Sequence, residues 1–268
     1  MAGTGQKIGK LKSLLQGYGS VLVAFSGGVD SSLLLKIAVD TLGDKAVAFT
    51  EASPLHQAWE VAEAQELAKE LGVTHIVFTS DELDGSVFST NPPDRCYICK
   101  KSIFARAIET AKELGLAEVI DGSNVDDLGE YRPGRKALAE LQIKSPLLEA
   151  GFTKKDIRSV SRKLGLPTWN RQSLACLASR FPYGTAITVE RLRQVELCET
   201  FLRNEGFSVF RVRYHGDSAR IEVKQSELKR LISSPLRERI IINFKAAGFT
   251  YVAVDLEGFR SGSMDEQL

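Results

Sequence analysis

VLVAFSGGVDSSLLLKIAVDTLG, residues 21–43, joins a short apolar run to a leucine-rich segment through two glycines, three serines and a carboxylate. Residues 21–25 predict a buried strand, and residues 31–42 predict a helix that Gly43 closes. In a glycine-rich turn of this kind, backbone N–H groups converge on an anion, and the start of the following helix adds partial positive charge. The stretch therefore predicts an α/β fold with an anion-binding turn.

Strands continue to alternate with helices beyond this turn. Strands are predicted at residues 45–50, 74–80 and 117–124, and helices at 54–72 and 99–114. This alternation is typical of a parallel sheet with helices on both faces.

The alternation stops near residues 165–175, so we predict a boundary close to Gln172. The first domain would comprise residues 1–172, and residues 173–268 would form a smaller α+β domain. The pattern in the second domain predicts a helix at 189–204, strands at 209–214 and 219–223, two further helices, and a last strand at 251–256.

Composition narrows the functional classes. The chain has 268 residues and a formal net charge of +1, which gives no global basic footprint for nucleic acid. It shows neither a secretory signal nor an apolar stretch near the roughly 20 residues of a membrane span, so we expect a cytoplasmic protein without a membrane partner. Four cysteines in such a chain favour metal binding or catalysis over a disulfide framework.

The turn lacks the Walker pattern and the G-x-G-x-x-G pattern. Its S-G-G-x-D-S motif resembles the pyrophosphate loop of the PP-loop ATP pyrophosphatase superfamily. The resemblance implies that ATP is cleaved between its α- and β-phosphates, which leaves an adenylate and pyrophosphate. The implied ATP-binding residues are Ser26, Gly27, Gly28, Val29, Asp30, Ser31 and Ser32.

Asp30 is the candidate Mg²⁺ contact, because a carboxylate beside phosphate needs a cation between them. A simple helix N-cap turn, with Asp30 compensating the helix dipole, is the alternative.

Further stretches resemble one family within this superfamily. They are DGSNVDDLGEYRPGRKAL from Asp121, SRFPYGT from Ser179 with Cys176 before it, RVRYHGDSARIEV from Arg211, and DLEGFRSGSMDE from Asp255. They are similar to the LarE family, sulfur transferases that help build the nickel-pincer nucleotide cofactor of lactate racemase. The resemblance implies that carboxylates of pyridinium-3,5-biscarboxylic acid mononucleotide become thiocarboxylates, and it implies a homo-oligomer.

Acidic and basic residues extend the predicted site. Asp126 and Asp127 follow the fourth strand at its carboxyl end, where open α/β sheets bind ligands, although a solvated loop pair is the alternative. Candidate phosphate clamps are Arg180, Arg211, Arg213 and, with less support, Arg260. Arg211 and Arg213 would share a strand face and could equally be solvent-exposed. Glu199 and Glu222 are weaker candidates for the catalytic site.

The cysteines bear on the sulfur source. In some LarE-family members, the cysteine matching Cys176 donates its own sulfur, and those members lack the C-x-x-C formed here by Cys96 and Cys99. Three thiolates can hold a [4Fe-4S] cluster and leave one iron open for sulfide, so we prefer Cys96, Cys99 and Cys176 as cluster ligands. A zinc half-site and a redox pair are alternatives. Cys198, among apolar helical positions, is expected in the core.

Three other functions compete with sulfur transfer to a small nucleotide. A tRNA thiolase would share the activation step, although near-neutral charge and the lack of paired terminal zinc-finger cysteines oppose it. An amide synthetase using ammonia has no need of three cysteines. A nucleotide sensor would use the fold without chemistry.

Overall fold

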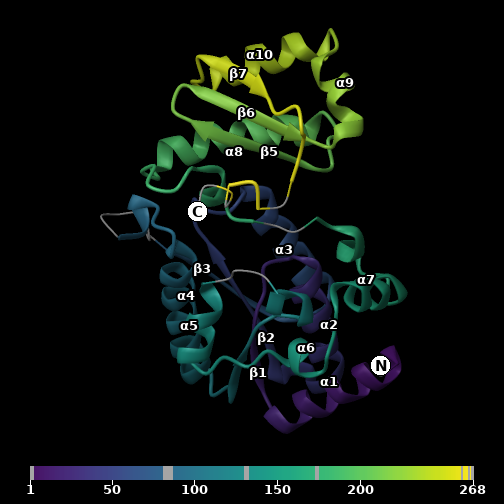
Figure 1. Ribbon diagram of the computed structural model, residues 1–268. Coiled ribbons are helices and arrows are strands. Elements are labelled where there is room, and N and C mark those ends of the chain that lie inside the picture. The colour runs from purple at the N-terminus through teal and green to yellow at the C-terminus, as the bar shows by residue number, and fades with distance from the viewer. Residues whose placement is uncertain are drawn as a thin grey trace. The chain divides into compact units, whose positions relative to one another are not determined.

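The computed structural model describes residues 3–80, 87–129, 133–172, 175–260, 262–264 and 266. The chain forms two compact units (Figure 1). Unit 1 comprises Met1–Ser53, Ala58–Ser80 and Asp94–Leu174, and unit 2 comprises Pro54–Gln57, Asp81–Pro93 and Ala175–Leu268. None of the helices formed by the described residues combines the length and the apolar character needed to cross a membrane.

Unit 1 is built around a parallel sheet with strand order β3-β2-β1-β4. The strands are β1 (Val21–Ala24), β2 (Ala46–Ala52), β3 (Thr74–Thr79) and β4 (Glu118–Ile120). Because successive side chains of a strand point to opposite faces, Val21 and Val23 enter one hydrophobic cluster while Leu22 enters another. Both faces are therefore buried, which accounts for the nearly continuous apolar sequence of β1.

Helices cover both faces of this sheet. The cluster around Val21 and Val23 contains residues of α1 (Thr4–Tyr18), α2 (Val29–Leu42), α3 (Ala58–Glu70), α6 (Pro146–Glu149) and α7 (Lys154–Lys163). The cluster around Leu22 contains residues of α4 (Arg95–Glu113) and α5 (Gly134–Glu140). The predicted α/β architecture is thus confirmed.

Some predicted boundaries were wrong. α3 begins at Ala58, not at Pro54, because residues 54–57 form a turn whose Leu55 carbonyl accepts from Leu177 N–H at 2.8 Å. α4 begins at Arg95, not at Cys99.

Asp94, directly after Pro92 and Pro93, is the N-cap of α4, so both prolines precede the helix and interrupt none of its hydrogen bonds. β4 ends at Ile120, not at Asn124, because its pairing with β1 ends at Val23 and Ile120. Further along, the Asn124 N–H bonds the Asp127 carboxylate at 2.9 Å.

Unit 2 contains a sheet of order β5-β6-β7, in which β5 and β6 are antiparallel and β7 is parallel to β6. The strands are β5 (Phe210–His215), β6 (Ser218–Val223) and β7 (Tyr251–Val254). The helices are α8 (Val189–Asn204), α9 (Leu228–Ile232) and α10 (Leu236–Ala246). A 3₁₀ turn, η5 (Leu177–Arg180), follows Cys176. α8 has the predicted bounds.

Candidate functional site: a phosphate-type turn in unit 1 and a clamped cysteine segment in unit 2

The loops that follow β1 and β4 meet at the carboxyl edge of the parallel sheet. β2 and β3 continue from β1 on one side and β4 lies on the other, so the strand order reverses between β1 and β4, where open α/β sheets bind ligands. Gly122 shows how closely the loops approach, since a Cβ there would lie 3.1 Å from Ser31 N. Asn124 Nδ2 also lies 3.4 Å from Asp30 Oδ1.

The glycine-serine turn presents several polar groups together. Gly27 has φ +69°, a conformation that favours glycine, and Gly28 is the N-cap of α2. Ser26 Oγ lies 3.2 Å from Ser31 Oγ, and Gly28 N–H donates to Ser26 Oγ at 3.4 Å. Such long contacts are weak, so a phosphate oxygen can replace them.

The other predicted residues of this turn face the protein interior. The Val29 side chain is buried, and the Ser32 side chain is fully buried. Ser32 Oγ has no hydrogen-bond partner among the described residues. Both residues therefore shape the first turn of α2 in this structure.

Asp30 and Asp126 both contact Lys154, the first residue of α7. Lys154 Nζ pairs with Asp30 Oδ2, and Lys154 N–H donates to Asp126 Oδ2 at 2.7 Å. Asp127 is buried and accepts the N–H of Asn124, so it is not a solvated loop residue. The predicted carboxylates thus gather near α2, and Lys154 links two of them.

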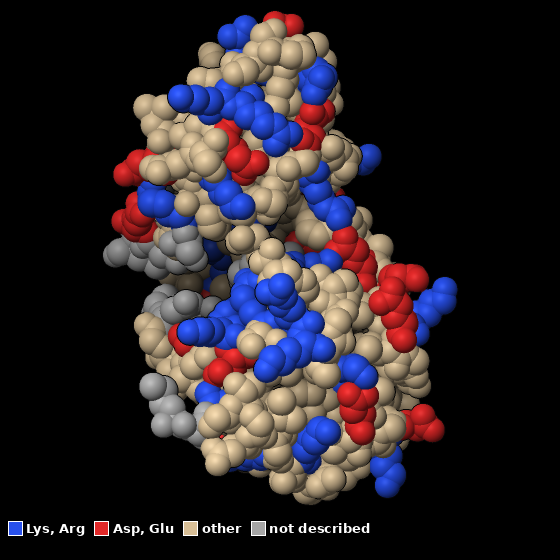
Figure 2. All heavy atoms as spheres, turned by 90° about the vertical axis from the view of Figure 1, so that its right-hand side faces the viewer, with Lys and Arg blue, Asp and Glu red and all other residues tan. Residues whose placement is uncertain are grey.

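Lys154 and Arg171 were absent from the residues predicted for this turn. The T-x-x-D capping box at Thr153 and Asp156 signals the start of α7 and could have directed attention to Lys154. Arg171 Nη1 donates to the Gly27 carbonyl at 2.7 Å, and nothing in the local sequence signals this contact. Figure 2 shows Lys and Arg side chains gathered on the face of unit 1 that carries α7.

In unit 2, Arg180 and Glu199 form a buried pair with two hydrogen bonds. Nε donates to Oε1 at 2.8 Å and Nη2 to Oε2 at 2.9 Å, and the two side chains are 2% and 1% exposed. Val212 N–H and Gln57 Nε2 also donate to Glu199. Burial favours the neutral acid, but the charge and hydrogen bonds of Arg180, with Arg211 and Val212, outweigh it and hold the pKa of Glu199 below its usual value.

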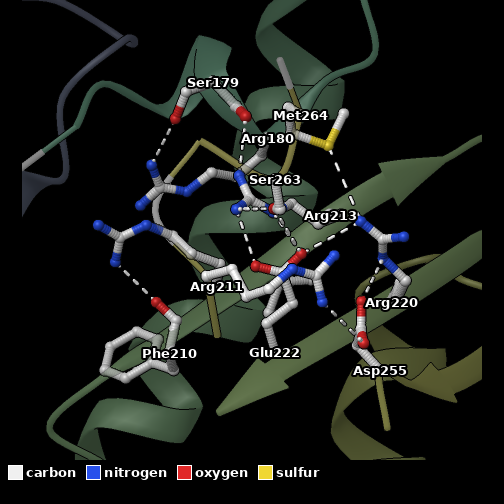
Figure 3. Close-up of polar contacts among 12 residues, drawn as sticks. Ser179, Arg180, Phe210, Arg211, Arg213, Arg220, Glu222, Asp255, Ser263 and Met264 are labelled. Carbon is white, nitrogen blue, oxygen red and sulfur yellow. Dashed lines mark hydrogen bonds and ion pairs between the residues drawn. The ribbon is translucent and has the colours of Figure 1, made fainter. Parts of the chain in front are cut away.

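A second buried pair joins β5 to β6 (Figure 3). Arg213 donates to both oxygens of Glu222, at 3.0 and 2.8 Å. Arg220 Nη2 and Ser263 Oγ contact the same carboxylate, each at 3.1 Å. The charge of Glu222, which is fully buried, is therefore compensated from several directions.

Both pairs bind the segment that carries Cys176. Arg180 Nη1 donates to the carbonyls of Ala175 and Cys176, at 2.8 and 3.2 Å. Arg213 Nη1 donates to the Ser179 carbonyl at 2.9 Å. In this structure the two arginines contact protein carboxylates and carbonyls, and their role as phosphate clamps stays a prediction.

Arg211 and Arg260 make other contacts in unit 2. The Arg211 guanidinium stands 5.2 Å from the Phe259 ring centre and donates to the Phe210 carbonyl. Arg260 pairs with Glu257 and Glu266 on the surface. Their predicted nucleotide contacts are untested.

The four cysteines occupy different environments. Cys96 and Cys99 stand one turn apart on α4, and Cys176 is partly buried. Cys198 is buried in α8, which confirms the expectation of a core residue, and burial followed by the charge of Glu199 raises the pKa of its thiol. The described residues show no group of three or more His, Cys, Asp or Glu side chains placed to hold a metal ion.

Comparison with known proteins identifies the chain. Residues 11–109 match the asparagine synthase family. The pyridinium-3,5-bisthiocarboxylic acid mononucleotide synthase of Lactiplantibacillus plantarum is 40% identical over 100% of this chain and 97% of its own. The chain belongs to the LarE family. This confirms the family predicted from the motifs, and with it the class of ATP-dependent sulfurtransferase.

Two uncharacterized proteins are also relatives of this LarE-family chain. One, from Synechocystis sp., is 40% identical over 97% of this chain and 98% of its own. The other, from Methanocaldococcus jannaschii, is 34% identical over 90% and 91%. All three relatives cover both units, so the similarity extends well beyond the glycine-serine turn.

Proposed function

We propose that this LarE-family protein adenylates a carboxylate of pyridinium-3,5-biscarboxylic acid mononucleotide and replaces one carboxylate oxygen by sulfur. The observation that carries the proposal is the turn at the sheet reversal, where Gly28 N–H and the Ser26 and Ser31 hydroxyls gather at the positive end of α2. The name of the L. plantarum relative supports the choice of substrate.

The chemistry explains the need for ATP. A carboxylate oxygen attacks the α-phosphorus, the bond to the β-phosphate oxygen breaks, and pyrophosphate leaves. A sulfur nucleophile then attacks the acyl carbon, and AMP departs with the former carboxylate oxygen. Positioning and charge stabilisation supply most of the acceleration in phosphoryl chemistry of this kind.

Asp30 fits a role as protein ligand of Mg²⁺. This ion retains several waters and takes one or two carboxylates together with substrate phosphates, so one aspartate at the turn suffices. Because the Lys154 ammonium pairs with Asp30, a positive charge is favourable beside this carboxylate. When bound, Mg²⁺ would neutralise charge on the triphosphate.

For the sulfur source, we propose a [4Fe-4S] cluster on Cys96, Cys99 and Cys176. The two thiols one helical turn apart fit two ligands of such a cluster. The described residues do not form a complete three-ligand group, so we derive no step through a cluster. A cluster held there would allow added sulfide to serve as the sulfur donor, whereas in the alternative Cys176 gives up its own sulfur.

A single-turnover experiment tests both levels of the proposal. Protein purified without oxygen is mixed with ATP, Mg²⁺ and the pyridinium dicarboxylate mononucleotide, with and without added sulfide. We expect AMP, pyrophosphate and thiocarboxylate in the presence of sulfide, and an unchanged protein mass.

The other outcomes are distinct. Loss of hydrogen sulfide from Cys176 establishes the sacrificial route. Retained turnover in Cys96→Ala also opposes the cluster, and Cys198→Ala serves as the matched control because its thiol is buried. No thiocarboxylate under any condition, or sulfur transfer to tRNA instead, overturns the proposed function.

A further inference from the structure

Arg171 contacts the backbone of the glycine-serine turn that would bind ATP. Its Nη1 donates to the Gly27 carbonyl at 2.7 Å, although the two residues are 144 positions apart. Its Nη2 pairs with Glu63 of α3, and the Arg171 side chain is only 20% exposed. The guanidinium therefore contacts both the Glu63 carboxylate and the Gly27 carbonyl.

The backbone around Arg171 is also fixed. Arg158 of α7 donates to the carbonyls of Trp169 and Arg171, at 3.0 and 2.8 Å. Lys154, one turn earlier on the same helix, pairs with Asp30. α7 thus contacts the turn directly through Lys154 and fixes the backbone of Arg171 through Arg158.

The contact with Gly27 determines which way the next N–H points. In a planar trans peptide the C=O and N–H point in opposite directions. Because the Gly27 carbonyl points to Arg171, the Gly28 N–H points away from it, toward Ser26 Oγ. Gly27 at φ +69° has the rotational freedom of glycine, so the peptide needs an external partner to fix its orientation.

We propose that Arg171 is a positioning residue for ATP: it holds the Gly27–Gly28 peptide so that Gly28 N–H faces the phosphates. Glu63 aligns the guanidinium for this task. Without Arg171 the peptide can rotate, and it then presents a carbonyl oxygen to the anion. The inference concerns ATP binding by this turn and does not depend on the sulfur acceptor.

Arg171→Ala, Arg171→Lys and Glu63→Gln test the proposal. The readouts are ATP affinity by calorimetry with Mg²⁺ and no second substrate, and the KM and kcat for ATP in pyrophosphate release. A hydrogen bond to a charged group supports a rise in the Kd and KM for ATP of about tenfold to a hundredfold in Arg171→Ala. We expect a smaller rise in Arg171→Lys, which keeps the charge, and in Glu63→Gln, with kcat less affected than KM in each.

Arg106→Ala is the matched control, because Arg106 forms an Arg–Glu pair on the surface of unit 1, away from the turn. Wild-type ATP affinity in Arg171→Ala overturns the proposal, as does an equal rise in Arg106→Ala. If Arg171→Ala does not fold, the two conservative variants decide, and unchanged ATP affinity in both overturns it. If the variants change ATP affinity as expected but the wild-type protein forms no thiocarboxylate, the result contradicts only the proposed substrate.

Discussion

Glu199→Gln tests whether the buried pair with Arg180 stabilises unit 2. Glu199 Oε1 accepts from Arg180 Nε and Val212 N–H, and Oε2 accepts from Arg180 Nη2 and Gln57 Nε2. A glutamine retains one acceptor and places an NH₂ against two donors. Gln57 can rotate its amide to accept from that NH₂, because its own Oε1 has no hydrogen-bond partner among the described residues.

The Arg180 charge then remains buried without its carboxylate. Removing one partner of a buried pair costs about 3–5 kcal/mol, and we expect a loss of this size in the free energy of unfolding of unit 2. Replacing both partners with apolar groups avoids the uncompensated charge. We therefore expect the double variant Arg180→Met/Glu199→Leu to lose less stability than Glu199→Gln alone.

The assay must report on unit 2 by itself. Both tryptophans, Trp59 and Trp169, lie in unit 1, so their fluorescence reports on the other unit. Cys198 is buried in α8 beside Glu199, and in a background without the other three cysteines its reaction with a thiol reagent during urea titration measures exposure of unit 2. A loss below about 1 kcal/mol in Glu199→Gln, or a larger loss in the double variant, refutes the reasoning.

The same pair predicts a pH dependence and an effect on Cys176. Because the pKa of Glu199 is lowered in the folded protein, its stabilisation is present above the usual carboxyl pKa and is lost as pH falls through the lowered value. The double variant also removes the donor to the Cys176 carbonyl. Alkylation of Cys176 should then be faster than in the parent protein. An unchanged rate would contradict the idea that Arg180 holds the Cys176 segment in place.

Three further predictions concern single positions. Gly27→Ala should lower the free energy of unfolding by about 1–2 kcal/mol, because Gly27 has φ +69° and the new Cβ would lie 3.1 Å from the Cβ of buried Ala64. The same change should weaken ATP binding in calorimetry, and a wild-type ATP affinity would contradict the role of this turn. Cys198→Ala should leave the number of reagent-accessible thiols in the native protein unchanged, and a drop of one would show that Cys198 is accessible. Asp156→Asn should lower stability in urea at pH 6 by about 1 kcal/mol, because it removes the negative charge that pairs with Lys7 at the first turn of α7 and leaves the Thr153 cap in place. Hydrogen bonding to Lys7 and then to Thr153 lowers the pKa of Asp156 to about 2 against burial, so the deficit should shrink as pH falls from about 4 toward 2, and a constant deficit would refute this.

The sequence by itself determined the parts of this protein that rest on local patterns. The apolar run into Ser26–Ser32 predicted both β1 and the turn, because strand burial, glycine freedom and a helix start leave signals within a few residues. The periodicity of α8 likewise predicted its bounds. Motif resemblance predicted the family that full-length similarity confirmed.

Only the tertiary structure decided what the charged side chains contact. Arg180 and Arg213 looked like candidates for phosphate binding, and each is buried against a glutamate. Arg171 lies in no motif of the sequence, yet its guanidinium contacts the Gly27 carbonyl, 144 positions away in the chain. Contacts between residues far apart in the chain leave no periodic or spaced pattern in the sequence, because folding alone brings those residues together.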